Sequence, residues 1–145
     1  GRMRFSIQSG APGNMRRILV IRRPYKPARK LKAKDEVRRF IMRLVRSSAD
    51  FTLDADEMTI RQGKVGKYTA WVADTRWYDR VKDRLGEGPA RWYVFADEKR
   101  GNLYAIEISA QGRGIGPDKI HKPNDKKEME LMEQMARIVT KIRIP

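Results

Sequence analysis

The chain has 145 residues, a length that suits one domain with a real hydrophobic core and leaves little room for a second. It contains no cysteine, which excludes disulfides, thiolate metal sites and cysteine nucleophiles. Its net charge of +15 is concentrated at one end, because the first 46 residues hold 15 of the 33 Lys and Arg but only two of the 18 acids. The apolar run near the start, residues 18–21, is too short for a membrane span or a signal-peptide core, so we expect a cytoplasmic protein without a membrane partner.

The N-terminal segment is predicted to be a basic arm that contains one short strand. Residues 8–14 are rich in turn-forming residues, and two prolines at positions 24 and 27 mark a second break. Between these breaks, residues 15–23 have an apolar centre with an arginine doublet at each end, which predicts a strand. We therefore divide the chain into an arm at residues 1–34 and a globular domain at residues 35–145.

The segment that begins at Asp35 has the period of an amphipathic helix. Its apolar residues fall at positions i, i+3, i+4, i+7 and i+8, and arginines occupy the other side. The apolar stripe consists of Val37, Phe40, Ile41, Leu44 and Val45. Asp35 stands where it can cap the helix or interact favourably with the helix dipole. The pattern predicts a helix over residues 35–46 with one basic face.

The middle of the chain predicts two hairpins with a helix between them. Residues 58–61 and 68–74 read as strands joined by a loop with two glycines. Residues 75–85 carry apolar side chains at spacings of four and are predicted to be helical. Residues 91–96 and 103–109 are rich in aromatic and β-branched side chains, which predicts the clearest hairpin of the chain.

A final helix is predicted to start near Asn124 or Asp125, after a glycine-rich loop that begins at Gly112. The order of elements is then β, α, β, β, α, β, β, α. Strands that are joined by short hairpins must be antiparallel. We therefore predict a single α+β domain with a mainly antiparallel sheet of about 4–5 strands and with its helices packed on one face.

The basic N-terminal region is the main functional signal. A charged surface without matching acids repels itself, so an anionic partner is expected. Arginine contacts phosphates and guanine edges in bidentate fashion and also stacks on bases, which favours nucleic acid, either DNA or RNA. Each phosphate contact releases counterions and adds affinity that is independent of base sequence. The residues predicted to contact phosphates are Arg16, Arg17, Arg22, Arg23, Lys26, Arg29, Lys30, Lys32, Arg38, Arg39, Arg43 and Arg46.

The predicted function is therefore non-enzymatic nucleic-acid binding, as an accessory or architectural component of a nucleoprotein assembly of a phage, plasmid or cell. Other proteins of that assembly are expected partners, and no cofactor or metal is predicted. A protein-interaction module whose basic arm docks on an acidic partner is one alternative.

Two further patterns bear on nucleic-acid contacts. The loop residues Gly112, Arg113, Gly114 and Lys119 offer free amides and cations that could cradle a phosphate, although a proline follows where a dinucleotide site requires a helix. Aromatic side chains can serve either as core residues or as platforms on which unpaired bases stack. The aromatic candidates are Trp71, Trp77, Tyr78, Trp92, Tyr93 and Tyr104.

The enzymatic alternative is a small nuclease or a ribonuclease toxin. Asp97 and Glu107 flank the clearest hairpin and Glu36 lies on a preceding helix, which resembles in outline the PD-(D/E)xK nucleases. The resemblance implies that these carboxylates hold a divalent cation that activates water. The chain departs from that motif at Ser109, which stands where the motif has its lysine, and in placing Asp97 after a strand. His121, the single histidine, could instead act as the general base of a ribonuclease.

Overall fold

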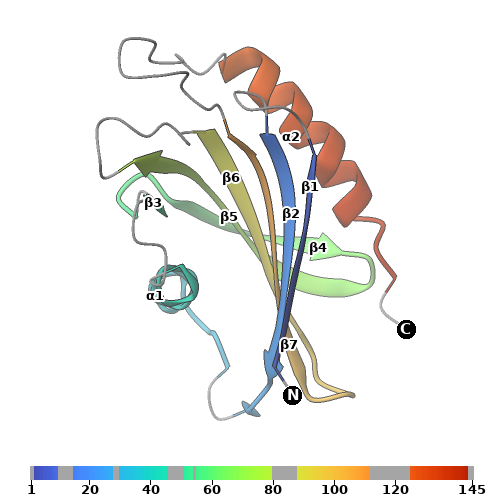
Figure 1. Ribbon diagram of the computed structural model, residues 1–145. Coiled ribbons are helices and arrows are strands. Elements are labelled where there is room, and N and C mark those ends of the chain that lie inside the picture. The colour runs from blue at the N-terminus through green and yellow to red at the C-terminus, as the bar shows by residue number, and fades with distance from the viewer. Residues whose placement is uncertain are drawn as a thin grey trace.

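The computed structural model describes residues 2–9, 15–27, 30–45, 51–53, 55–79, 88–111 and 125–143. These residues form a seven-stranded antiparallel sheet with two helices, α1 and α2 (Figure 1). In chain order the elements are β1 Met3–Ser9, β2 Met15–Pro24, α1 Lys34–Leu44, β3 Phe51–Leu53, β4 Thr59–Val65, β5 Tyr68–Asp79, β6 Gly88–Asp97, β7 Asn102–Gln111 and α2 Asp125–Val139. Neither described helix is long and apolar enough to cross a bilayer.

The sheet has the order β1-β2-β7-β6-β5, and the last of these strands pairs with both β3 and β4. β5 is long enough for this, because its first half pairs with β4 and its last three residues pair with β3. β2 pairs with β7 over ten residues, from Met15 opposite Gln111 to Pro24 opposite Asn102. The beginning of the chain therefore lies beside the β6–β7 hairpin, which is far away in sequence.

The predicted N-terminal arm contributes two of the seven strands. Over residues 3–9, where no strand was predicted, the chain pairs with β2 as the edge strand β1. β2 is apolar on both faces: Leu19 and Ile21 are buried on one, and Ile18 and Val20 are half-buried on the other. A strand that is apolar on both faces is typical of the interior of a sheet. The prediction of about 4–5 strands was therefore too low.

The two helices cover opposite faces of the sheet (Figure 1), so the prediction that the helices pack on one face was wrong. α1 buries Val37 and Ile41 in the cluster that contains Trp92. α2 buries Met132 in the cluster that contains Ile106, on the other side of the sheet. The reason lies in the central strands, which carry apolar residues at both even and odd positions and therefore on both faces of the sheet. β6, for example, is buried along almost its whole length. A sheet of this kind needs cover on both faces.

The prediction of a helix over residues 75–85 was wrong as far as residue 79, because β5 continues through Asp79; residues 80–87 lie outside the described part of the chain. The apolar spacing of four that suggested a helix is also an even number, and even spacings share one face of a strand. Residues 71–77 form a strand rather than a helix because they pair with β6, from Trp71 opposite Val94 to Trp77 opposite Gly88.

Several local predictions are confirmed. The hairpin of β6 and β7 matches the predicted strands and turns at Gly101, whose φ of +67° lies in the region that favours glycine. The hairpin of β4 and β5 turns in the same way at Gly66. α1 and α2 begin within a residue of their predicted starts.

Candidate nucleic-acid interface

The pleat of β2 divides the two arginine doublets between the faces of the sheet. Arg17 and Arg23 lie on the face of Leu19, which α1 covers. Arg16 and Arg22 lie on the opposite face, where their β7 partners Ala110 and Tyr104 pack with α2. Residues that are adjacent in sequence therefore serve different surfaces.

Arg17 is committed to an internal ion pair. Its Nη2 and Nε atoms donate hydrogen bonds to Oε1 of Glu107 at 2.5 and 3.2 Å. The Nε1 atom of Trp77 donates to the other carboxylate oxygen at 3.1 Å, and the Arg17 guanidinium lies 5.5 Å from the centre of the Trp77 ring. The Glu107 side chain is fully buried and that of Arg17 is 22% exposed. This cluster joins β2, β5 and β7, and it removes Arg17 from the predicted phosphate contacts.

Burial raises the pKa of the Glu107 carboxyl above its ordinary value, and the Arg17 guanidinium and the Trp77 N–H offset only part of that effect. A raised pKa means that the folded protein binds a proton at Glu107 more tightly than the unfolded chain does. The contribution of this carboxyl to stability therefore falls as the pH rises above the unfolded pKa of 4.5 and through the folded pKa.

Glu107→Gln tests whether the contribution of this carboxyl to stability falls as the pH rises. The amide keeps the size of the side chain and an oxygen that can accept from Trp77, but it does not ionise. We expect the free energy of unfolding of the wild-type protein, relative to that of Glu107→Gln, to decrease as the pH rises from acidic to neutral. Urea unfolding of both proteins across this range measures the difference. An increase with pH would mean that the ion pair outweighs the desolvation of the carboxylate.

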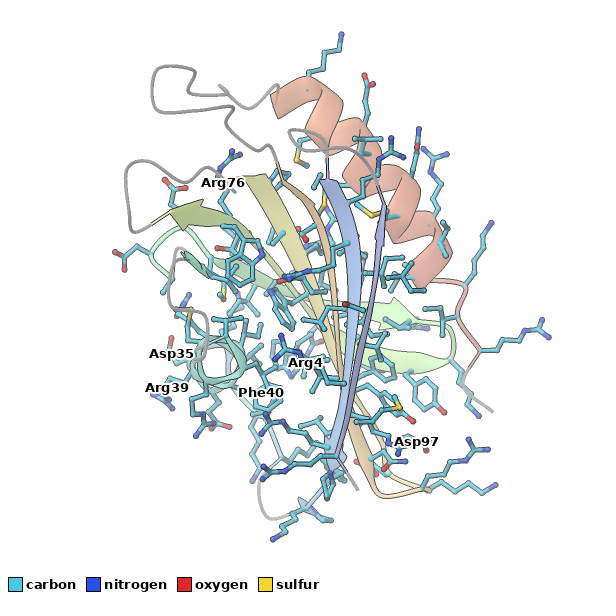
Figure 2. The ribbon with its side chains drawn as sticks, viewed as in Figure 1. Arg4, Asp35, Arg39, Phe40, Arg76 and Asp97 are labelled. Atoms are coloured by element: carbon cyan, nitrogen blue, oxygen red, sulfur yellow. The ribbon has the colours of Figure 1, made fainter. Side chains whose placement is uncertain are left out.

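The carboxylates of the nuclease hypothesis do not converge. Glu107 lies on the α1 face of β7, whereas Asp97 lies on the α2 face of β6 and opposite Asn102, at the far end of the hairpin (Figure 2). Glu36 lies on α1, where it accepts a hydrogen bond from the backbone N–H of Lys32 at 3.1 Å. In the described ranges no three such side chains cluster as metal ligands do. The predicted carboxylate arrangement is therefore wrong.

The other residues of that hypothesis have different positions. Ser109, which stands where the nuclease motif has its lysine, is fully buried on the same face as Glu107. The candidate base His121 lies outside the described residues. So do all four residues of the predicted phosphate loop, Gly112, Arg113, Gly114 and Lys119.

A set of basic side chains gathers on the α1 side of the sheet. Arg39 and Arg43 are exposed on α1, on the side away from its buried residues, and Figure 2 shows Arg39 directed away from the sheet and Phe40 toward it. Lys32 is exposed in the segment that leads into α1. Arg23 and Arg4 lie on the same face of the sheet, since Arg4 is opposite Ile21 in the β1–β2 register. We call these five residues the α1-side basic surface.

None of these five side chains has an acidic partner among the residues that the structure describes. The nearby acid Asp35 is bound instead by Arg38, whose Nη1 lies 2.7 Å from it. Arg38 also donates to the backbone oxygen of Met58 at 3.3 Å, so it has a structural role. Arg4 was missing from the predicted contacts because no strand was predicted at residues 3–9.

The remaining predicted contacts are dispersed. Arg16 and Arg22 lie on the α2 face, and Lys26 is exposed in the segment after β2. Lys30 lies 4.0 Å from Glu98, and both side chains are largely exposed. Arg29 and Arg46 lie outside the described residues. The structure therefore places Arg23, Lys32, Arg39 and Arg43 from the predicted set on the α1 side of the sheet and adds Arg4.

Most of the aromatic candidates are core residues. Trp77, Trp92, Tyr93 and Tyr104 are all buried, and the side chain of Tyr78 lies outside the description. Tyr104 stacks on Phe95, with ring centres 5.3 Å apart. Trp71 differs from these residues, because it is only half-buried and lines a pocket.

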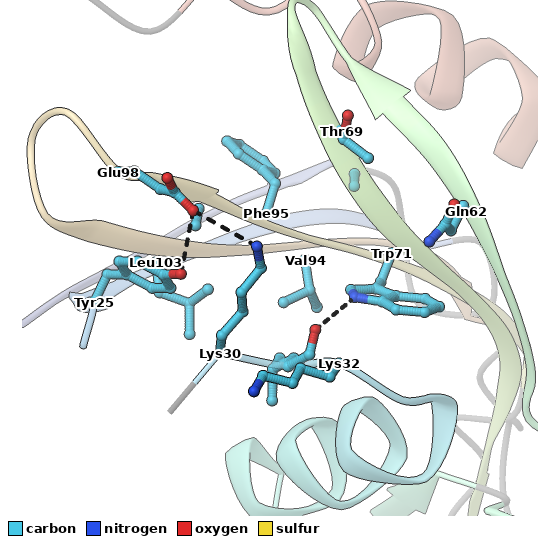
Figure 3. A pocket seen from close by; sticks show the side chains of 13 residues that line it. Tyr25, Lys30, Lys32, Gln62, Thr69, Trp71, Val94, Phe95, Glu98 and Leu103 are labelled. Atoms are coloured by element: carbon cyan, nitrogen blue, oxygen red, sulfur yellow. Dashed lines mark hydrogen bonds and ion pairs between the residues drawn. The ribbon is translucent and has the colours of Figure 1, made fainter. Parts of the chain in front are cut away.

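That pocket has a volume of about 490 Å³ and lies between the segment at residues 30–32 and the sheet (Figure 3). The Nε1 atom of Trp71 donates to the backbone oxygen of Leu31 at 3.2 Å, which ties the segment to β5. At the hairpin end, the Tyr25 hydroxyl donates to Glu98 at 3.3 Å. The lining residues are Tyr25, Lys30, Leu31, Lys32, Gln62, Thr69, Ala70, Trp71, Val94, Phe95, Ala96, Glu98 and Leu103.

Comparison with known proteins shows a likeness of fold. No protein-family model matches the chain, and no curated protein matches it. Among solved structures, it is similar to a Pseudomonas aeruginosa protein of unknown function, PA94, named as a "Putative Regulator". The match has a TM-score of 0.57 and 12% sequence identity, and it covers 100% of this chain and 85% of the other. The two chains therefore share an arrangement of strands and helices.

Proposed function

We propose that this protein binds nucleic acid without cleaving it, through the α1-side basic surface formed by Arg4, Arg23, Lys32, Arg39 and Arg43. The observation that carries the proposal is that these five cations lie on one side of the molecule without an acidic partner in the described ranges. Such a surface attracts a polyanion, and each phosphate that it neutralises releases counterions. This role suits an accessory or architectural component of a nucleoprotein assembly.

The arrangement of Arg39 and Arg43 supports the proposal in particular. They are four residues apart on the exposed side of α1, where like charges repel each other and destabilise a helix slightly. Bound phosphates would relieve this repulsion. α1 itself is held by Val37 and Ile41, both fully buried, so that the helix presents its arginines from a fixed position.

The test replaces Arg39 and Arg43 together by Gln. Both are exposed, so we expect the unfolding midpoint to stay nearly unchanged. Affinity for duplex DNA should fall, and the slope of log K against log salt should become shallower by about 2, since each phosphate contact contributes roughly 0.9. Fluorescence anisotropy with a labelled duplex over a series of salt concentrations measures both quantities.

A matched control replaces Arg137 and Lys141 by Gln; Arg137 lies in the last turn of α2 and Lys141 just after it, and both are exposed on the other side of the sheet. This pair makes the same change in net charge, so its salt slope should stay close to that of the wild-type protein. Equal losses from the two pairs would reduce the binding to an effect of net charge, and no loss from Arg39 and Arg43 would contradict the proposed interface.

Point substitutions are needed because the N-terminal region cannot simply be removed. Deleting residues 1–32 would take away β1 and β2, and with them the partner strand of β7. It would also expose buried apolar residues such as Leu19 and Ile21. A loss of binding by such a truncation would therefore report unfolding rather than lost phosphate contacts.

A further inference from the structure

The pocket beside Trp71 combines an apolar wall with a polar rim. Trp71, Val94 and Leu103 supply apolar surface from three neighbouring strands, as Figure 3 shows. The Gln62 amide and the Thr69 hydroxyl lie at the rim on β4 and β5. The volume of about 490 Å³ falls within the usual range of small-ligand sites. A flat ligand with apolar faces and polar edges suits this lining.

Two lysines stand at the mouth of the same pocket. Lys32 is exposed, and it is also part of the α1-side basic surface. The ammonium of Lys30 is 4.0 Å from the Glu98 carboxylate, with both side chains more than half exposed. A pair that is so exposed is held only weakly, so Lys30 can turn to another anion. The pocket thus offers positive charge where its apolar wall meets the surface.

We infer that this pocket holds the base of one nucleotide, with the neighbouring phosphate on Lys30 or Lys32. A nucleobase has two apolar faces, which pack on aromatic side chains, and polar edges, which an amide and a hydroxyl can bind. In a duplex the base is already stacked and paired, so the pocket can take only an unpaired one. The inference rests on the proposed function and adds a preference for single strands.

Such a nucleotide can come from a single strand or from the pool of free mononucleotides. Continuity favours the strand, because Lys32 belongs both to the pocket and to the α1-side basic surface. A strand that lies along that surface would bring a base to the mouth of the pocket, with further phosphates near Arg39. A free nucleotide would use the pocket alone.

The experiment compares binding of oligo(dT), and of a duplex of equal length, to the full chain and to two pocket variants. Trp71→Leu removes the ring, and Ala96→Met fills the pocket from a neighbouring strand without removing a wall. We expect both variants to weaken oligo(dT) binding, by roughly 5-fold to 160-fold for Trp71→Leu, the range for loss of one base–aromatic stack. Duplex affinity and the salt slope should change little, because stacking involves no counterion release.

Tyr68→Leu is the matched control, since Tyr68 is a half-buried aromatic residue of the same strand that packs on the other face of the sheet. It should leave oligo(dT) affinity unchanged. If the wild-type protein binds oligo(dT) but neither pocket variant weakens that binding, the pocket inference is wrong and the proposed function stands. If the wild-type protein binds neither nucleic acid, the proposed function itself fails.

AMP distinguishes the two sources of the nucleotide. We expect AMP to compete with oligo(dT) only weakly, and to lose this competition in Trp71→Leu. AMP binding that depends on Trp71, together with oligo(dT) binding that does not, would assign the pocket to a free nucleotide and overturn its role in strand binding.

Discussion

Replacing Arg17 by Ala is expected to lower the free energy of unfolding by about 3–5 kcal/mol, the usual effect of breaking a buried ion pair from one side. The substitution leaves Glu107 fully buried without its cation, while the Trp77 Nε1 atom still donates a hydrogen bond to it. The carboxyl must then either stay charged without its cation or bind a proton. Because protonation becomes harder as the pH rises, the loss of stability should be larger at neutral pH than at acidic pH.

Arg16→Ala is the control for this prediction. Arg16 is the neighbour of Arg17 in sequence, but it lies on the other face of β2, is half-buried and has no acidic partner in the described part of the chain. Its replacement should change stability by no more than about 0.5 kcal/mol, as surface substitutions usually do. Urea unfolding of both variants gives the two free energies. Equal effects would show that the Glu107 cluster is not a stabilising centre of the sheet.

The difference between these neighbouring arginines shows what the sequence could not reveal about the site. Charge density identified both residues as phosphate contacts, because it ignores the direction in which a strand places each side chain. The partner of Arg17 lies 90 residues away and became adjacent only through the pairing of β2 with β7. A strand was predicted at residues 15–23, but nothing in the sequence indicated its neighbour.

The alternation of side chains along a strand also explains why the predicted convergence of the nuclease carboxylates was wrong. Asp97 and Glu107 are both acidic and flank one hairpin, which makes them look like a pair in the sequence. In the β6–β7 register Asp97 is opposite Asn102, so residues 104 and 106 share its face and Glu107 does not. A firm prediction of the turn at residues 98–101 would have separated these two carboxylates from the sequence alone.

Locally encoded elements were predicted well. α1 has a helical apolar period of its own, and the hairpin of β6 and β7 has a tight turn between two apolar strands, so neither depends on distant residues for its identification. β1 also carries a local signal that the prediction missed, since Met3, Phe5 and Ile7 alternate strictly with polar residues, whereas its place as an edge strand depends on β2. The placement of α1 and α2 on opposite faces is likewise a property of the whole sheet. The α1-side basic surface, which includes Arg4, could therefore be recognised only from the structure.

The last large effect is expected at Trp92, the largest of the fully buried side chains. Its ring lies on the α1 face between the cross-strand partners Ala73 and Glu107, with Ala90 two residues before it on β6. The small side chains of Ala73 and Ala90 leave room for the indole. Trp92→Ala should therefore destabilise the protein by about 3–5 kcal/mol, through lost transfer free energy and the cavity left behind.

Trp92→Phe separates the packing of this side chain from its polarity. The Nε1 atom of Trp92 is buried without a hydrogen-bond partner in the described ranges, a state that costs roughly 1–3 kcal/mol. Phenylalanine removes this unpaired N–H and keeps a ring in the space, so its loss of volume is partly offset and the net change in stability should be much smaller than for Ala. Urea unfolding of the two variants measures both free energies. A loss for Trp92→Phe as large as that for Trp92→Ala would mean that the indole N–H makes a stabilising contact, and that packing alone does not explain why this residue is tryptophan.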